Sequence, residues 1–477
     1  MEHNKMPVKA TPYKHQQEAF DFACRLFGVP GVAAPVSKGC FYLMDMGTGK
    51  TITATAAAGF LYNNSKIKRV LIVAPLSILG VWRDEFEKWA AFDYALAILE
   101  GSSAKKADAL RNLTGVPLQV AVLNYESAWR LETELLAWQP DLIIADESHK
   151  IKTHNTRASK ALHKLGSAAK YRLALTGTPV TNKAIDLFSQ MKFLNPAIFG
   201  MSFYTFRNRY FDMKGYGNHT PVMKKSMESE LTQKLHSISY RAKKESCLDL
   251  PEFTDVTIKV DLEPTALKLY RDLVKDSFTK LGESEVTATN ILTRLLRLSQ
   301  LTGGFLGRDD DPCPQSVSTA KLDALADLID TAQESGQKIV IIARFIAEIT
   351  AIKRLLEKRG IQYSSISGET KNRTEQVRRF QDNPDVTVFV GQIATAGLGI
   401  TLTAASTMIF FSTDYSMSNY EQARARIHRV GQSERCVYYH LVARGTVDEK
   451  VLKVLKDKAN LAKTLVDDYR SGRNPFE

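Results

Sequence analysis

A short apolar run followed by two glycines and a lysine constrains this chain more than any other stretch. Residues 41–43 predict a buried strand, and Gly47-Thr48-Gly49-Lys50-Thr51 then predicts a tight turn that opens a helix rich in Thr and Ala. Glycines let backbone N–H groups curl around a phosphate, Lys50 supplies a charge for the terminal phosphates, and the Thr51 hydroxyl suits Mg²⁺. The strict phosphate-loop pattern expects a glycine where Met44 stands, so a plain glycine turn beside an exposed lysine is the alternative. The context predicts a nucleoside triphosphate site.

Length and charge limit the number of domains and the kind of partner that we expect. A chain of 477 residues is too long for one ordinary core, so we expect two or three domains. The formal net charge of +12 favours a polyanionic partner, and a generally basic surface is the alternative. The five cysteines are scattered without a C-x-x-C pair, which favours a reducing compartment and argues against a metal framework.

The N-terminus lacks a secretory pattern, and only one stretch suggests a membrane segment. Residues 386–413 contain no charge, but glycines and threonines interrupt them. We interpret this stretch as two buried strands joined by a loop, and not as a spanning helix.

Apolar strands alternate with helical segments along both halves of the chain. This alternation predicts parallel sheets covered on both faces, in which ligands gather at the carboxyl ends of the strands. Lys50, Asp146 and Glu147 all fall at such ends. The expected strands are 41–43, 69–74, 119–123, 141–145 and 173–176 in the first half, and 338–343, 363–367, 386–390 and 408–411 in the second.

The carboxylate of Asp146 directly follows four apolar residues, a costly position unless a cation or a donor lies nearby. We expect Asp146 to hold Mg²⁺ and Glu147 to polarise an attacking water. An acidic pair that caps the next helix is the alternative. A further strand runs into Thr176-Gly177-Thr178-Pro179, another glycine turn.

Near the end of the second half, Arg426 and Arg429 stand three residues apart. On a helix they would share one face, and two guanidinium groups together suit phosphate charge. A basic solvated face or a nucleic-acid patch is the alternative.

The lysine loop, Asp146-Glu147-Ser148-His149 and the 176–179 turn resemble motifs I, II and III of superfamily 2 helicases and translocases. The string from Gln422 to Gln432 resembles motif VI of the Snf2 family. Tyr240-Arg241-Ala242-Lys243-Lys244 with Leu250-Pro251 and Tyr270, and Ser318-Thr319-Ala320-Lys321-Leu322 with Leu325, are also similar to that family. The departures are Met44 and Asp45, Ala425, Thr401 and an atypical stretch at 393–399.

The resemblance implies an α/β fold of two tandem RecA-like lobes, each a mostly parallel sheet with helices on both faces, plus Snf2-type helical insertions. The first lobe is expected at 1–250, with an insertion near 183–250. The second is expected at 251–477, with an insertion near 255–320, a C-terminal helicase lobe near 321–447 and a final helix at 449–468.

The resemblance also implies a set of site residues. Gln16 would read adenine, Lys50 would hold phosphates, and Thr51 and Asp146 would hold Mg²⁺. Glu147 would orient water, and Arg426 and Arg429 would reach the same ATP from the second lobe. The whole catalytic set is Lys50, Asp146, Glu147, Arg426 and Arg429, and the nucleotide-binding set is Tyr13, Gln16, Gly47, Thr48, Gly49, Lys50, Thr51 and Gln422.

The activity implied is that of a DNA-stimulated ATPase that moves along double-stranded DNA. The alternatives are a strand-separating, branch-migrating or annealing helicase, and a nucleotide-gated clamp with little turnover. The expected DNA contacts are Pro75-Leu76-Ser77, Asn124-Tyr125, Arg344, Gly368 and Thr395-Ala396-Gly397, with Arg207, Arg209, Lys224, Lys225 and 241–244 as candidate basic contacts that a solvated face explains equally well.

No accessory domain is evident in the sequence. We therefore expect a bare motor, nearest to annealing-helicase and phage or bacterial branches, that acts as a monomer and is targeted by a protein partner or by DNA structure. The expected location is cytoplasmic or nucleoid-associated in a prokaryote or virus and nuclear in a eukaryote, without secretion or a membrane.

Overall fold

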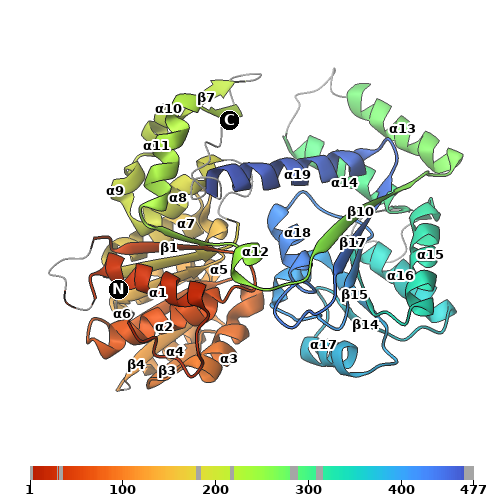
Figure 1. The fold of residues 1–477 in the computed structure, drawn as a ribbon. Helices are drawn as coiled ribbons and strands as arrows, with labels where there is room; N and C mark the ends of the chain where they lie inside the picture. Colours follow the sequence, from red (N-terminus) through yellow and green to blue (C-terminus); the bar gives the residue numbers. More distant parts are fainter. Residues whose placement is uncertain are drawn as a thin grey trace. The chain divides into compact units, whose positions relative to one another are not determined.

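The structure, a computed structural model, describes residues 4–29, 31, 36–115, 117–178, 184–214, 220–279, 288–307 and 315–466 (Figure 1). The chain divides into two compact units. Residues 1–249 and 458–477 form the first, and residues 250–457 form the second. Each unit is built around its own parallel sheet.

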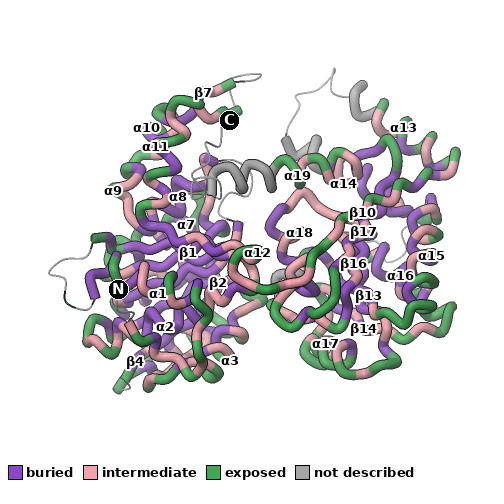
Figure 2. The backbone as a smooth tube through the Cα atoms, viewed as in Figure 1, coloured by how far each residue is buried: buried purple, intermediate pink, exposed green. Residues whose placement is uncertain are grey.

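The first sheet has the strand order β3-β4-β2-β5-β6-β1-β9, and every neighbouring pair in it runs parallel. Continuous apolar runs form its central strands because both faces of the sheet are covered. Figure 2 shows the buried course of β1 and β2. The strands are β1 (Gly39–Met44), β2 (Arg69–Ala74), β3 (Tyr94–Ile98), β4 (Leu118–Asn124), β5 (Leu142–Asp146), β6 (Tyr171–Thr176) and β9 (Ser239–Ala242).

The direction of each crossover decides which face a helix covers. Parallel crossovers are right-handed, so helices between strands that step one way along the sheet lie on one face, and the rest lie on the other. The helices α2 (Lys50–Asn63) and α3 (Leu79–Trp89) therefore share a face, and α1 (Lys14–Phe27) packs on α2. The opposite face takes α4 (Ser103–Asn112), α5 (Tyr125–Arg130), α6 (Glu132–Trp138) and α7 (Arg157–Ala168).

A mainly helical segment follows β6 in the first unit, as the resemblance implied. Its aromatic side chains pack on one another; Phe206, for example, contacts Phe188, Phe199 and Tyr210. The elements are α8 (Leu187–Leu194), α9 (Pro196–Phe199), α10 (Phe203–Tyr210), β7 (Phe211–Lys214), β8 (Thr220–Met223), α11 (Lys225–His236) and α12 (Lys244–Cys247).

The second sheet has the order β10-β17-β16-β13-β15-β14, again parallel throughout. The strands are β10 (Phe253–Val260), β13 (Ile339–Ala343), β14 (Tyr363–Ile366), β15 (Val388–Gln392), β16 (Thr407–Phe410) and β17 (Cys436–Ala443). The helices are α13 (Pro264–Thr279), α14 (Ala288–Thr302), α15 (Ala320–Glu334), α16 (Ile346–Lys358), α17 (Arg373–Asp382), α18 (Met417–Arg424) and α19 (Val447–Val466), with a small β11 (Phe305–Leu306) and β12 (Gln315–Ser316) pair.

These sheets confirm the expected fold class and all the expected strands, with small shifts at their ends. The uncharged stretch forms β15 and β16 with a 3₁₀ turn (Ile393–Leu398) between them, as interpreted. Among the described residues, no helix is long and apolar enough to cross a membrane. Four strands, β3, β9, β10 and β17, were not predicted. Polar and apolar residues are mixed in β9 and β10, whereas β3 is a continuous apolar run and β17 is interrupted only by His440, so both of these were overlooked.

Candidate active site

The glycine loop lies at the carboxyl end of β1, where the backbone turns into α2. Gly47 and Gly49 have φ values of 83° and 89°, in the left-handed region that favours glycine. A Cβ on Gly49 would lie 2.1 Å from Gln16 Nε2. The loop therefore needs glycine at position 49 for its backbone and for the close approach of Gln16.

Two side chains of α1 hold this loop. His15 Nε2 lies 2.8 Å from the carbonyl oxygen of Thr48, and Gln16 Nε2 donates to the same oxygen at 3.2 Å. Gln16 Oε1 accepts from the backbone N–H of Tyr13 at 3.0 Å. A primary amide has two N–H donors, so Gln16 keeps a second donor besides its bond to the loop. The structure thus brings Tyr13, Gln16 and Thr48 together.

The charged groups of the loop are held by backbone and by β9. Lys50 Nζ donates to the carbonyl oxygens of Met44 at 3.0 Å and Asp45 at 3.3 Å. Arg241 Nη1 donates to Asp45 Oδ1 at 2.6 Å and to the carbonyl oxygen of Leu43 at 3.0 Å. The Arg241 side chain is only 10% exposed. Arg241, expected as a basic DNA contact, instead braces the loop, which corrects that prediction.

Asp146 ends β5 and is buried. Its Oδ2 accepts from the indole N–H of Trp82 at 3.0 Å, and its carbonyl oxygen accepts from the Tyr125 hydroxyl at 2.7 Å. Burial and the neighbouring Glu147 carboxylate raise the pKa of Asp146 to about 7, although the charge of Lys50 and the Trp82 donor act in the opposite direction. A carboxylate in this position is suited to bind a cation.

Glu147 has a φ of 50°, a left-handed conformation that is uncommon for a residue with a side chain. Its Oε2 lies 3.2 Å from His149 Nδ1, and the same His149 nitrogen lies 3.4 Å from the Thr176 hydroxyl. The Thr176 hydroxyl also accepts from the N–H of Thr178 at 3.1 Å. His149 thus links the acidic pair to the 176–178 turn; Pro179 lies outside the described residues.

These residues fit ATP with Mg²⁺. The loop offers backbone N–H groups freed by two left-handed glycines, with Lys50 beside them, and α2 begins at Lys50 with its positive end toward the loop. Thr51 lies in the first turn of α2, half-exposed. Asp146 is a buried carboxyl whose raised pKa a cation would lower. Lys50, Thr51, Asp146 and Glu147 therefore form one group at the carboxyl edge of the first sheet.

The predicted arginine pair of the second unit lies outside a helix. The helix α18 ends at Arg424, and turns follow, so the shared helical face expected for Arg426 and Arg429 is wrong. The two side chains still converge, because Nη1 of each donates to the carbonyl oxygen of Ile400, at 3.3 Å and 3.4 Å. Arg426 Nε also donates to the carbonyl oxygen of Gln422 at 2.9 Å. Tertiary contacts, and not helical spacing, pair them.

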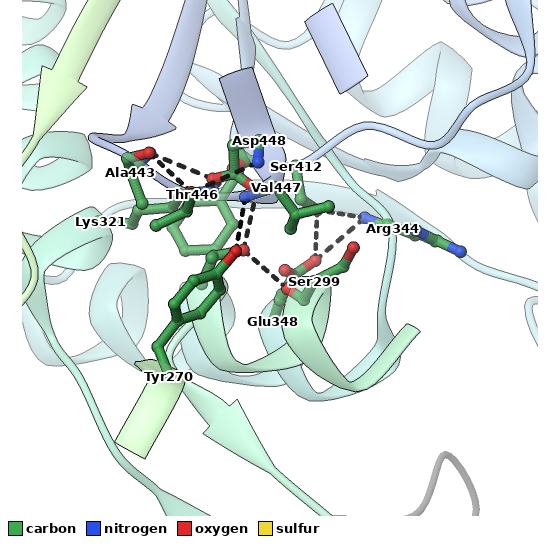
Figure 3. A network of polar contacts seen from close by, with 12 residues as sticks. Tyr270, Ser299, Lys321, Arg344, Glu348, Ser412, Ala443, Thr446, Val447 and Asp448 are labelled. Atoms are coloured by element: carbon green, nitrogen blue, oxygen red, sulfur yellow. Dashed lines mark hydrogen bonds and ion pairs between the residues drawn. The ribbon is translucent and has the colours of Figure 1, made fainter. Parts of the chain in front are cut away.

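A buried ion pair sits at the start of α19 in the second unit (Figure 3). Lys321 Nζ lies 2.6 Å from Asp448 Oδ2, and the Lys321 side chain is 2% exposed. Asp448 also accepts from the Thr302 hydroxyl at 2.8 Å, and the Tyr270 hydroxyl accepts from the N–H of Val447 at 2.8 Å. Lys321 and Tyr270, noted in the sequence as family-like positions, thus join the helical insertion to α15 and α19.

The predicted DNA-contact residues differ in exposure and in the partners that they bind. Leu76 is 69% exposed and Gly368 is exposed, as a contact surface requires. Tyr125 is 4% exposed and bonds to Asp146, so as a DNA contact it was wrong. Arg209 pairs with Glu230 at 2.9 Å. The environment of Ala396 and Gly397 lies outside what the structure describes.

The sequence analysis gave no role to Trp82, His15 or His149. Trp82 and His15 are far from their partners in the sequence, and no local pattern marks them. His149 stood inside the Asp146–His149 motif, which was the only available signal.

Together, the two parallel sheets, the glycine loop and the acidic strand end define a two-lobe, ATP-binding protein of the RecA-like, helicase-like class. A family model of the SNF2-related domain matches residues 15–303, and one of the helicase conserved C-terminal domain matches residues 320–431. The chain belongs to the SNF2-related family of superfamily 2 helicase-like proteins.

Curated relatives are similar over most of this chain. The chromodomain-helicase-DNA-binding protein 1-like of Danio rerio is 25% identical over 91% of this chain and 42% of its own length. The DNA repair and recombination protein RDH54 of Saccharomyces cerevisiae is 27% identical over 90% and 52%. The RAD54-like protein of Gallus gallus is 26% identical over 97% and 68%. The chain thus spans about half the length of the first two relatives.

Among solved structures, a SWI2/SNF2 ATPase core of Sulfolobus solfataricus, determined in complex with double-stranded DNA, is 26% identical. The match covers 99% of this chain and 96% of that one, with a TM-score of 0.48.

Proposed function

We propose that this protein is a DNA-stimulated ATPase that couples ATP hydrolysis to movement along double-stranded DNA. The observation that carries the proposal is the grouping of Lys50, Asp146 and Glu147 at one edge of the first sheet. There the charge of Lys50 acts on Asp146, whose pKa is raised to about 7 chiefly by burial and by Glu147. Relatives named for DNA repair and for helicase function support DNA as the polymer.

Within this proposal each residue has one task. The loop N–H groups and Lys50 bind the phosphates, and Thr51 and Asp146 hold Mg²⁺, which supplies Lewis-acid charge to the phosphates when bound. Glu147 accepts a proton from, or orients, the attacking water, and His149 keeps its carboxylate in place. Tyr13, Gln16 and Gln422 complete the nucleotide-binding set.

We assign Arg426 and Arg429 to the charge that develops on the transferred phosphoryl group. Their convergence on Ile400 presents two fixed cations together. Arginine fingers of this kind contribute about three to five orders of magnitude in rate. ATP-dependent closure of the units, followed by release, would then drive stepwise movement.

The test is ATPase rate with and without duplex DNA, for the natural chain and three variants. Lys50→Ala should abolish hydrolysis while DNA binding survives. Glu147→Gln and Arg429→Ala should lose turnover while nucleotide binding is retained. Arg378→Ala, which removes an exposed arginine of α17, is the matched control and should keep full activity. Full turnover in any of the three variants would remove that residue from its task.

Three outcomes separate the competing activities. Displacement of a triplex-forming strand without unwinding supports movement on duplex DNA. Separation of a forked, fluorescently labelled duplex would point to a strand-separating helicase. An ATPase rate that DNA leaves unchanged would favour a nucleotide-gated clamp.

A further inference from the structure

The first sheet carries a second cluster of charged residues at its amino edge, the end opposite the glycine loop. Each of three neighbouring strands is preceded by a charged residue: Lys68 before β2, Asp141 before β5 and Lys170 before β6. The strand register, in which Val70 pairs with Leu142 and Leu142 pairs with Tyr171, brings Asp141 level with Lys170 and with Arg69, one residue after Lys68. The proposed ATPase uses none of these residues.

Asp141 organises this edge. Its Oδ2 accepts from the backbone N–H groups of Lys68 at 2.7 Å and Arg69 at 3.1 Å, and its Oδ1 lies 2.8 Å from Lys170 Nζ. The carboxylate is therefore compensated locally. Its contact with Lys68 is to the backbone N–H, and the Lys68 residue is exposed.

The edge is also hollow. A cavity of about 580 Å³ opens here, a size typical of ligand sites. Lys66, Lys68, Arg69 and Lys170 line it beside Asp141, so its lining carries a net charge of +3, from four cations and one anion. The rest of the lining includes apolar side chains, among them Leu136.

Arg69 is fixed within this wall. Its Nη1 donates to the carbonyl oxygen of Trp138 at 2.7 Å, and its Nε donates to Gln119 Oε1 at 3.3 Å. One cation is thus preorganised. The exposed Lys66 and Lys68 can adjust to an anion, and Lys170, also exposed, is held beside Asp141 by its ion pair. A rigid cation with adjustable neighbours lowers the entropic cost of binding a charged segment.

We propose that this cavity docks an acidic segment of a partner protein, with carboxylates on the lysines and an apolar side chain toward Leu136. Charge complementarity requires an anionic ligand. The concave and partly apolar lining favours a peptide over a DNA duplex, whose phosphates form a convex and wholly polar surface. The proposal is independent of the ATPase chemistry, because the cavity lies at the opposite end of the strands.

The test uses the full chain and fluorescence anisotropy with a short labelled peptide of Glu residues around a central Leu. The peptide should bind the natural protein, and the double variant Lys68→Glu, Lys170→Glu should bind it at least about tenfold more weakly, since two attractive contacts become repulsive. The charge-matched control Lys105→Glu, Lys160→Glu changes exposed lysines of α4 and α7 outside the cavity and should bind normally. DNA-stimulated ATPase should be unchanged in both.

Four results would overturn the proposal. The first is absence of peptide binding to the natural protein, and the second is equal weakening in the cavity and control variants, which would show general charge attraction. The third is full affinity for a peptide whose Leu is replaced by Gln. If inorganic pyrophosphate also displaces both peptides equally well, the cavity is a simple anion site. The fourth is a loss of affinity for duplex DNA in the cavity variant while its affinity for the peptide is unchanged.

Discussion

The indole N–H of Trp82 donates to Asp146 Oδ2 at 3.0 Å and so joins α3 to the carboxyl end of β5. This bond stabilises the ionised form of a carboxyl whose pKa is already raised to about 7. Trp82 is buried at 1% exposure, and its bond opposes the larger effects of burial and of Glu147 on the pKa of Asp146.

Trp82→Phe should shift the acid limb of the ATPase pH profile to higher pH. The phenyl ring fills much of the same space but cannot donate, so the pKa of Asp146 rises further and Mg²⁺ competes with a proton over a wider range. The measurement is turnover against pH at a fixed Mg²⁺ concentration. Activity should recover toward the natural level at alkaline pH.

The control for this variant is Trp89→Phe on the same helix. Trp89 donates to Glu85 at 2.9 Å, away from the acidic pair. Its pH profile should match that of the natural protein. A profile of Trp82→Phe that is lowered at every pH without a shift would contradict the assigned role.

Mg²⁺ binding to the natural protein should weaken as pH falls through about 7. The folded pKa of Asp146 lies above its ordinary value of 3.8, so the nucleotide-free folded state holds more protons than the unfolded chain between these values. Without Mg²⁺ the free energy of unfolding should therefore decrease as pH rises from about 4 to 7 through this group. Added Mg²⁺ should reverse that loss above pH 7, as thermal unfolding in the two conditions would show.

Gly49→Ala should abolish nucleotide binding. A Cβ there meets Gln16 Nε2 at 2.1 Å, and the φ of 89° is strained for alanine. The matched control is Gly80→Ala in α3, where nothing lies within 4 Å of the added carbon. That control should keep full binding and stabilise the helix by about 0.5–1 kcal/mol. Binding of a fluorescent ATP analogue distinguishes the two, and normal affinity in Gly49→Ala would refute the proposed loop geometry.

Lys321→Met should destabilise the second unit by about 3–5 kcal/mol, because it leaves the Asp448 carboxylate without its cation in a largely buried site. The control is Lys259→Ala, which breaks the half-exposed pair with Glu449 at 3.5 Å and should cost about 0–1 kcal/mol. Urea unfolding of the full chain measures both. Equal costs would show that the Lys321 pair contributes no more than a surface contact.

DNA affinity should fall with salt, at roughly 0.9 log unit per log unit of salt for each phosphate contacted. Arg344→Ala should reduce that slope by about one contact, because Arg344, in the turn between β13 and α16, is a proposed backbone contact. Titrations of labelled duplex at several salt concentrations give the slope. A slope near zero in the natural protein would argue against movement along the phosphate backbone.

Much of the fold could be predicted from local patterns. Continuous apolar strands such as Arg69–Ala74 predict parallel sheets covered on both faces. The glycines before Lys50 predict a turn that can approach a phosphate. The edge strand β10 was missed because its residues alternate between exposed and half-buried and lack the continuous apolar run of the central strands.

The partners of individual side chains could not be predicted from the sequence. Arg426 and Arg429 meet at Ile400, although the expected helix ends at Arg424, and Arg241 binds Asp45 across 196 positions instead of facing DNA. Backbone preference and hydrophobic period are local properties, so residue order could establish the strands, the loop and the family. Hydrogen bonds between distant side chains depend on the packing of the finished sheet, and so the partners of Trp82, Arg241 and Asp448 emerged only from the folded chain.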